Sequence, residues 1–203
     1  HVDMTDNFSM EEWGKVIDVA KKHDLMLFED RKFADIGRVT ETQMAGMYDI
    51  RSWADLVTSH SVSGPDIVDG IASAWDSVQR VGGVLLLAQM SSRGNLLDRS
   101  YTDRTMEIGT SSPHVIGYIG NGSNPNQVSE LRKKAGDGKM IWTPGVNLSD
   151  NEGALGQRYG HPSDAIKAGS DAVIVGSGIH GAPDPVASAR AYADATWAAL
   201  LSR

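Results

Sequence analysis

A cluster of ionised side chains early in the chain has the composition of a site for proton transfer. Four of them follow an apolar segment directly and a fifth comes three residues later: Glu29, Asp30, Arg31, Lys32 and Asp35. If a strand continues through them, Asp30 and Lys32 point the same way, because side chains alternate between the faces of a strand. A carboxylate beside an ammonium group changes the pKa of both and suits proton transfer or electrostatic action on an anionic substrate. The alternative is a surface ladder of salt bridges, which contributes little to stability.

Length and composition place these residues in an ordinary globular protein. The chain has 203 residues, 40% of them hydrophobic and 22% charged, which suits a single domain over residues 1–203. The net charge of -7 argues against binding to nucleic acid or to anionic lipid. No apolar run is long enough to span a membrane. Cysteine is absent, which excludes thiolate chemistry and disulfides and is typical of a reducing compartment. We expect a cytoplasmic protein.

Short apolar runs recur about every thirty residues along the chain and predict strands. They are Leu25–Phe28, Ala54–Thr58, Val84–Met90, Val115–Ile119, Met140–Thr143 and Ala172–Val175. Amphipathic helical patterns lie between them, one opened by a capping box at Ser9 and Glu12 and another by Pro65. Further helices are expected at 127–135, 162–168 and 184–201.

Alternation of strand and helix at this period indicates βαβ units around a parallel sheet. A doubly wound sheet and an eight-stranded barrel both fit, but no glycine-rich dinucleotide fingerprint follows the first strand. We therefore predict a (βα)8 TIM barrel that lacks the first βα unit and most of strand 2 in this chain. Residues 1–4 are expected to be the end of that second strand.

Active sites of such barrels lie at the carboxyl ends of the strands. Polar residues and glycines follow the predicted strands at that edge: His1 and Asp3; Asp30, Lys32 and Asp35; Ser59 and His60; Ser91 and Ser92; Gly120, Asn121 and Gly122; Pro144, Gly145 and Asn147; Gly176, Ser177 and Gly178. The last group could bind phosphate through backbone N–H groups. The long polar loop 147–161 carries Gln157 and Tyr159 and could close over a phosphate as a lid. Taken singly, each residue also has a structural explanation, such as a hydrogen-bonded core histidine at position 60.

The segment Phe28–Gly37 resembles the signature of the orotidine 5′-monophosphate decarboxylase family, in its eukaryotic-type branch. Other landmarks of that family follow in order and extend the resemblance over essentially the whole chain: His1-Val2-Asp3, Trp53-Ala54-Asp55, Met90-Ser91-Ser92, Thr143-Pro144-Gly145-Val146, Gly156-Gln157-Arg158-Tyr159 and Val175-Gly176-Ser177-Gly178-Ile179. The resemblance implies a homodimeric (βα)8 barrel. Its activity would be conversion of orotidine 5′-monophosphate (OMP) to UMP and CO2, the last step of pyrimidine nucleotide synthesis, without metal or cofactor.

The resemblance also implies a role for each matching residue. Asp30 would face the substrate carboxylate, Lys32 would protonate C6, and the partner subunit's Asp35 would complete a Lys–Asp–Lys–Asp array. The substrate-binding residues implied are His1 and Thr40 near the ribose, Ser91 and Pro144 at the base, and Gln157, Tyr159, Gly176, Ser177 and Gly178 around the phosphate.

Three departures from the family pattern bear on activity. The first lysine of the array would precede His1, so we expect the chain as written to be neither a closed barrel nor fully active. Ser177 stands where the family has an arginine that grips phosphate, which predicts weaker phosphate binding. Arg38-Val39-Thr40 replaces the family's Asn-Thr-Val, which leaves the ribose contact of Thr40 open.

Two other functions remain open at this point. The Asp-x-Lys-x-x-Asp spacing of residues 30–35 also occurs in Mg²⁺-dependent sugar-phosphate barrels, the hexulose-phosphate synthases and ketogulonate-phosphate decarboxylases. The chain could also be a catalytically silent nucleotide-binding homologue, because the first lysine is missing and Ser177 replaces an arginine.

Overall fold

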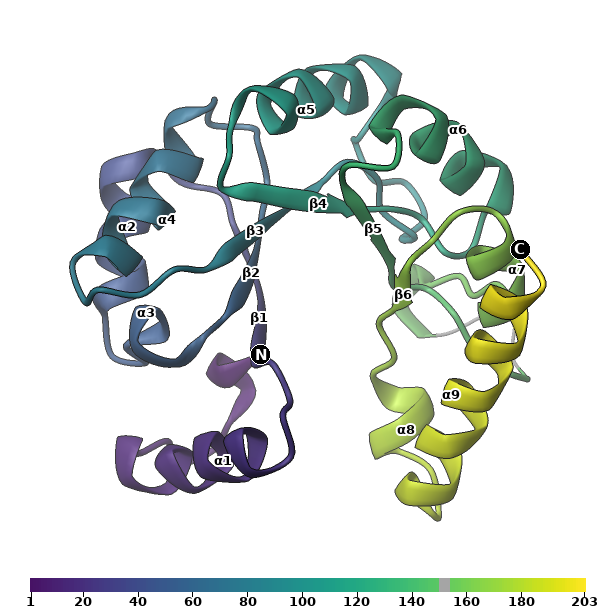
Figure 1. The fold of residues 1–203 in the computed structure, drawn as a ribbon, viewed down its shortest axis with the longest axis horizontal. Helices are drawn as coiled ribbons and strands as arrows, with labels where there is room; N and C mark the ends of the chain where they lie inside the picture. The colour runs from purple at the N-terminus through teal and green to yellow at the C-terminus, as the bar shows by residue number, and fades with distance from the viewer. Residues whose placement is uncertain (150–153) are drawn as a thin grey trace. The chain divides into compact units, whose positions relative to one another are not determined.

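The structure, a computed structural model, describes residues 1–149 and 154–203 and forms two compact units (Figure 1). The first unit comprises residues 1–87 and 107–116, and the second comprises residues 88–106 and 117–203. The prediction of one domain over 1–203 stays a prediction.

In the first unit, parallel strands pair in chain order, β1 with β2 and β2 with β3. The strands are β1 (Phe28–Phe33), β2 (Leu56–Ser59) and β3 (Gly83–Leu87). The helices are η1 (Val2–Met4), α1 (Met10–Lys22), α2 (Gly37–Ala45), α3 (Ile50–Trp53) and α4 (Asp66–Asp76). Every residue of β2 and β3 is buried, as expected for parallel strands covered on both faces.

The second unit repeats the arrangement, with β4 parallel to β5 and β5 parallel to β6. The strands are β4 (Val115–Ile119), β5 (Met140–Thr143) and β6 (Ala172–Val173). The helices are α6 (Pro125–Ala135), η2 (Ala154–Gly156), α7 (Pro162–Lys167), α8 (Ser177–His180) and α9 (Pro185–Leu201). Helix α5 (Arg99–Ser111) and strand β4 contribute residues to both units. The predicted class, α/β with parallel strands and crossover helices, is confirmed.

The helix starts follow local chemistry. The Ser9 side chain accepts a hydrogen bond from the Glu12 backbone N–H, so the predicted capping box opens α1. Asn124 and Asp184 cap α6 and α9 in the same manner, and each is followed by proline at the first helical position.

Two expectations about the first residues need correction. Residues 1–4 form a 3₁₀ turn and no strand, since the N–H groups of Met4 and Thr5 bond to the carbonyls of His1 and Val2. The first strand was also predicted at the wrong position, Leu25–Phe28, because β1 begins at Phe28 and continues through the charged residues to Phe33. Charged side chains can continue this strand because the carboxylates find hydrogen-bond donors, as described below.

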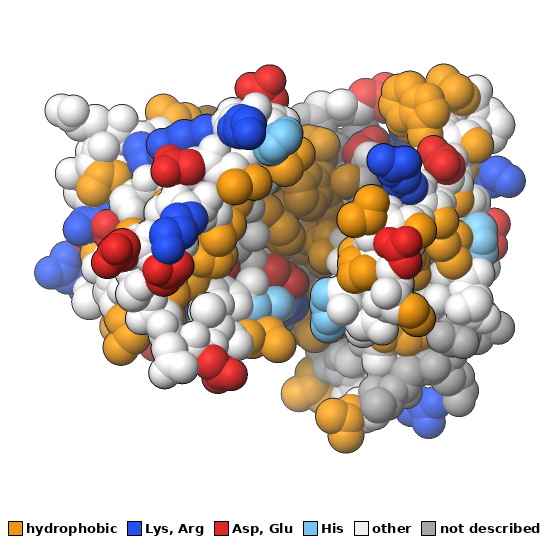
Figure 2. All heavy atoms as spheres, turned by 90° about the horizontal axis from the view of Figure 1, so that it is seen from below, with side chains coloured by type: hydrophobic (Ala, Val, Ile, Leu, Met, Phe, Trp, Pro, Cys, Tyr) orange, Lys and Arg blue, Asp and Glu red, His pale blue; other side chains and the backbone are white. Residues whose placement is uncertain are grey.

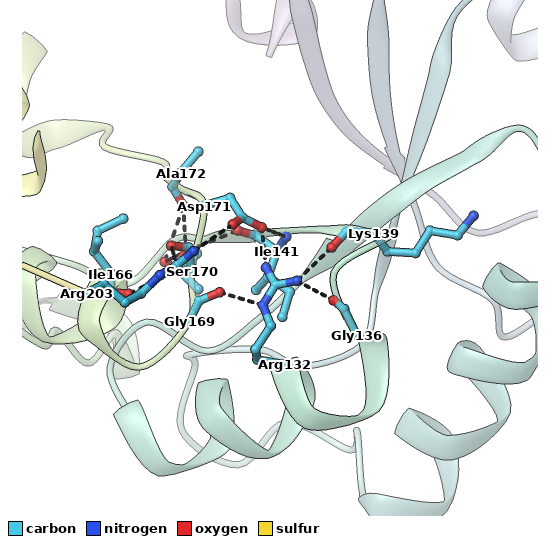
Figure 3. A network of polar contacts seen from close by, with 11 residues as sticks. Arg132, Gly136, Lys139, Ile141, Ile166, Gly169, Ser170, Asp171, Ala172 and Arg203 are labelled. Carbon is cyan, nitrogen blue, oxygen red and sulfur yellow. Dashed lines mark hydrogen bonds and ion pairs between the residues drawn. The ribbon is translucent and has the colours of Figure 1, made fainter. Parts of the chain in front are cut away.

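A network of polar contacts joins α6, β5 and β6 in the second unit (Figure 3). Arg132 forms an ion pair with Asp171 and also donates to the carbonyls of Gly136 and Gly169. Asp171 accepts the Ile141 backbone N–H and lies 3.6 Å from Arg203, which donates to the Ser170 carbonyl. The network therefore fixes the turns that lead into β5 and β6.

The surface is mixed in character. On the face shown in Figure 2, basic and acidic side chains are interspersed and hydrophobic side chains lie exposed among them. Trp197 and Leu201 of α9 are among the exposed hydrophobic residues. Among the helices of residues 1–149 and 154–203, none is long and apolar enough to cross a bilayer.

Candidate functional site

The first unit brings Asp30 and Lys32 into direct contact. Lys32 Nζ donates to Asp30 Oδ2 over 2.6 Å, and Thr58 Oγ1 donates to Asp30 Oδ1 over 2.8 Å. Both oxygens of the carboxylate thus have a donor, one from its own strand and one from β2. The prediction that Asp30 and Lys32 lie on one side of the strand is confirmed by this contact.

The backbone at Lys32 is strained. The register between β1 and β2 shifts between Glu29 and Phe33, and Lys32 has a φ of 53°, in the left-handed region. This conformation costs an L-residue about 1–2 kcal/mol. Lys32 N–H donates to Thr58 Oγ1 over 2.9 Å, which supplies the partner that a regular ladder would have given. Strain of this kind at an ionised residue is a common property of functional sites.

His1 lies beside the Asp30 carboxylate, and the buried Glu29 holds the backbone next to His1. Glu29 is 1% exposed and its two oxygens accept the Val2 N–H at 3.0 and 3.3 Å. This contact holds His1, whose Nε2 lies 3.4 Å from Asp30 Oδ2. His1, Asp3 and Glu29 are also close enough together to ligate a metal ion. Glu29 already binds an N–H group, however, and Asp3 pairs with Arg31, so the group fits a structural role.

His60 follows β2 and is half-buried. Burial lowers the pKa of His60, and the positive charge of Lys32 lowers it further. The imidazole is therefore neutral under conditions in which an exposed histidine begins to take up a proton.

Asp35 and Thr40 lie beyond the end of β1. Asp35 is exposed, its Oδ1 accepts the Ile36 N–H, and it lines a surface hollow together with Lys32. Thr40 in α2 is fully buried and donates to the Asp35 carbonyl over 3.1 Å. The hydroxyl of Thr40 thus fixes the loop of Asp35, and its contact with ribose stays a prediction.

In the second unit, Ser91 and Gln157 meet although they are far apart in sequence. Gln157 Nε2 donates to Ser91 Oγ over 2.9 Å, and Arg158 Nε donates to the Ser91 carbonyl over 3.2 Å. Gly145 lies against the same serine, and its φ of 75° and the 2.5 Å between its would-be Cβ and Ser91 Cβ both require glycine. Ser91, Gln157 and the turn after β5 therefore form one polar cluster.

Pro144 and Tyr159 border this cluster and both are half-buried. The Pro144 carbonyl accepts the Gly122 N–H, and the backbone of Gly160 bonds to Gly145 and Asn147, which ties the two ends of the long loop together. Residues 150–153 of the predicted lid 147–161 lie outside the described residues. The lid stays a prediction.

Gly176, Ser177 and Gly178 form the turn into α8, and the first two are exposed. Gly178 packs against Tyr192, whose hydroxyl would lie 2.4 Å from a Cβ at this position. The Tyr192 hydroxyl also accepts the Leu148 N–H over 3.2 Å. This turn is thereby held close to the loop that follows β5.

Thr58 is a site residue that the sequence pattern did not predict, because it lies in the apolar run Ala54–Thr58, which indicates a buried strand. Its hydroxyl contacts both Asp30 and Lys32. The available signal was a hydroxyl residue near the carboxyl end of an otherwise apolar run, next in the sheet to the charged strand.

Comparisons with known proteins agree on one family. The model described as "Orotidine 5'-phosphate decarboxylase / HUMPS family" matches residues 1–192. The chain is 40% identical over 210 residues to orotidine 5′-phosphate decarboxylase of Pichia kudriavzevii, covering 100% of this chain and 77% of the relative. The enzyme of the same name from Maudiozyma exigua is 41% identical over 208 residues, covering 100% and 75%.

Solved structures of orotidine 5′-phosphate decarboxylases share the fold of this chain. Orotidine 5′-phosphate decarboxylase from Pyrococcus horikoshii OT3 superposes with a TM-score of 0.68 at 27% identity, over 91% of this chain and 82% of that one. The decarboxylase from Methanocaldococcus jannaschii, complexed with the inhibitor BMP, gives 0.70 at 22% identity, over 90% and 79%. The second likeness concerns the fold alone.

Proposed function

Because the chain belongs to the orotidine 5′-phosphate decarboxylase / HUMPS family, we propose that it is a lyase that converts OMP to UMP and CO2. The observation that carries the proposal is the Asp30–Lys32 contact of 2.6 Å, with the second Asp30 oxygen held by Thr58. The family description also names HUMPS, but the relatives at 40% and 41% identity are named as OMP decarboxylases.

Lys32 carries the proton chemistry in this proposal. When the bond from C6 to the carboxylate breaks, CO2 leaves and the electron pair stays on C6. An ammonium group beside C6 stabilises that charge and then gives its proton to form the C6–H bond of UMP. Lysine is afterwards protonated again from water, so the reaction requires neither a metal ion nor a cofactor.

Asp30 keeps Lys32 in place and faces the departing carboxylate. Two adjacent carboxylates repel each other, and the repulsion ends when CO2 leaves. His1, 3.4 Å from Asp30, is proposed to approach the ribose.

In the second unit, Ser91 is proposed to bind the pyrimidine edge beside Pro144. The exposed backbone at Gly176 and Ser177 is proposed to bind the phosphate, with Gly178, Gln157 and Tyr159. In the present structure Gln157 is engaged with Ser91, so binding of phosphate by its amide requires this 2.9 Å contact to open. Phosphate lies far from C6, so its binding energy can promote loop closure and raise kcat.

The proposal includes a cytoplasmic homodimer in which the partner subunit's Asp35 completes the array. Support comes from the exposure of Asp35 and from the hollow that it lines with Lys32. Mixing inactive Lys32→Ala and Asp35→Ala proteins should restore about a quarter of the wild-type activity, because half of the chains would pair as mixed dimers with one intact site each. Mixtures that stay inactive would contradict a shared site.

The activity itself is tested with protein expressed from its complete gene. Purified protein is incubated with OMP, with and without EDTA, and UMP and CO2 are quantified. We expect equal amounts of both products and no effect of EDTA. Loss of activity in EDTA would favour the Mg²⁺-dependent barrels, and tight OMP binding without product would show a silent homologue.

A further inference from the structure

We infer that Thr58 is a positioning residue, whose single hydroxyl sets both the backbone of Lys32 and the carboxylate of Asp30. The inference rests on the proposed function for its catalytic consequence. Its structural part stands on contacts between β1 and β2 alone.

The direction of the hydrogen bonds is determined by chemistry. A backbone N–H can only donate, so Thr58 Oγ1 must accept from Lys32 N over the observed 2.9 Å. The hydroxyl proton then points to Asp30 Oδ1, 2.8 Å away. An ionised carboxylate can only accept, and Asp30 does so at both oxygens, since Oδ2 accepts a hydrogen bond from Lys32 Nζ.

The three groups thus form a closed ring: Lys32 N–H to Thr58, Thr58 to Asp30, and Asp30 to Lys32 Nζ. Thr58 is 0% exposed, so water cannot replace its hydroxyl from the outside. Without the hydroxyl, Oδ1 of the part-buried Asp30 carboxylate and a strained N–H group would both lose this partner. Asp30 would be free to rotate, and Lys32 Nζ would follow it.

Valine and serine separate the role of the hydroxyl from that of the side-chain volume. Thr58→Val keeps the shape and removes the hydroxyl, whereas Thr58→Ser keeps the hydroxyl. A matched control is Thr102→Val in α5, because the Thr102 hydroxyl is also buried and bonds to backbone carbonyls of Ala88 and Asp98. Both valine variants lose a buried hydroxyl, but only the Thr58 hydroxyl contacts Asp30 and Lys32.

Steady-state kinetics with OMP give the first readout. We expect Thr58→Val to lower kcat about 100-fold with little change in KM, because a misplacement of about 1 Å has an effect of this size. Thr58→Ser should stay within about threefold of the wild type, and Thr102→Val should lower the melting temperature without lowering kcat. A Thr58→Val enzyme with wild-type kcat would overturn the inferred role of Thr58 in catalysis.

Amide hydrogen exchange of Lys32, followed by NMR, gives a readout that does not depend on activity. The Lys32 N–H should be protected in the wild type and in Thr58→Ser, and should exchange faster in Thr58→Val. Unchanged protection in Thr58→Val would overturn the inference, while an inactive wild type would overturn only the proposed function. If Thr58→Val does not fold, Thr58→Ala removes the same hydroxyl and is measured in its place.

Discussion

Single residues of the first unit are held by partners on β1 itself, on the neighbouring β2 and in the turn of residues 1–4. Asp30, Lys32 and Thr58 bind one another, and Glu29 binds the backbone that carries His1. A charged pair preorganised in this way needs no rearrangement when charge develops on a substrate, which is the main source of electrostatic catalysis.

His60 provides a prediction about pH at this scale. Burial and Lys32 lower the pKa of His60 in the folded protein below the ordinary value of 6.5, so the unfolded chain takes up a proton first as the pH falls. Neutral His60 therefore contributes its full stability above about pH 6.5, and this contribution is lost as the pH falls through the folded-state pKa.

Replacing His60 by glutamine should reduce the loss of unfolding free energy between about pH 7 and pH 5. Urea unfolding at several pH values measures this dependence. The wild-type protein, measured in parallel, is the reference for this slope. An identical slope in His60→Gln would contradict the assignment.

At the scale of elements, α2 and α4 lie side by side and touch through their backbones (Figure 1). A Cβ at Gly70 would lie 2.2 Å from the Gly37 carbonyl oxygen, and a Cβ at Gly37 would lie 2.3 Å from the Asp66 carbonyl oxygen. Backbone atoms cannot move aside as a flexible side chain can. The two glycines thus set the position of α2, which begins directly after the loop of Asp35.

We predict that Gly70→Ala destabilises the protein by about 3 kcal/mol and lowers the turnover of OMP, because α2 must move outward. Gly14→Ala is the matched control, since Gly14 lies in α1 and a Cβ there meets nothing within 4 Å. That change should stabilise the protein by up to about 1 kcal/mol and leave turnover unaltered. Thermal unfolding and kinetics of both variants test the pair.

The elements differ in how far the sequence predicts them. β4 and β5 match the predicted runs because they are apolar from end to end, and α1 matches its capping box. β1 extends further than predicted, because Asp30 accepts from Thr58 and Glu29 accepts from the Val2 N–H, and no local pattern reveals these contacts. The left-handed backbone at Lys32 likewise depends on the register against β2. The sequence predicts which polar residues follow the strands and are therefore candidates for the site. It does not predict contacts such as that of Gln157 with Ser91, because these depend on tertiary structure.

At the scale of the whole molecule, each of the two compact units has its own polar anchor. In the second unit this anchor is Asp171, which binds Arg132 and the Ile141 N–H and lies near Arg203 (Figure 3). Removing the carboxylate leaves the Ile141 N–H without this acceptor and removes the ion pair of Arg132, which keeps its contacts with backbone carbonyls.

Asp171→Ala should therefore destabilise the second unit by about 2 kcal/mol. Hydrogen exchange should show lost protection in β5 and β6 with little change in β1 and β2. Asp18→Ala, at an exposed position of α1, should alter neither region. Equal loss of protection in both units would contradict an anchor confined to the second.

The rate of UMP formation from OMP in wild type, Lys32→Ala and Lys15→Ala tests the central claim most directly. Lys15 is an exposed lysine of α1 that pairs with Glu12, so its removal controls for loss of a positive charge. We predict that Lys15→Ala retains the wild-type rate and that Lys32→Ala loses at least about 100-fold, because Lys32 is the proposed proton donor to C6. Wild-type turnover in Lys32→Ala would contradict the assignment of the Asp30–Lys32 pair as the centre of the reaction.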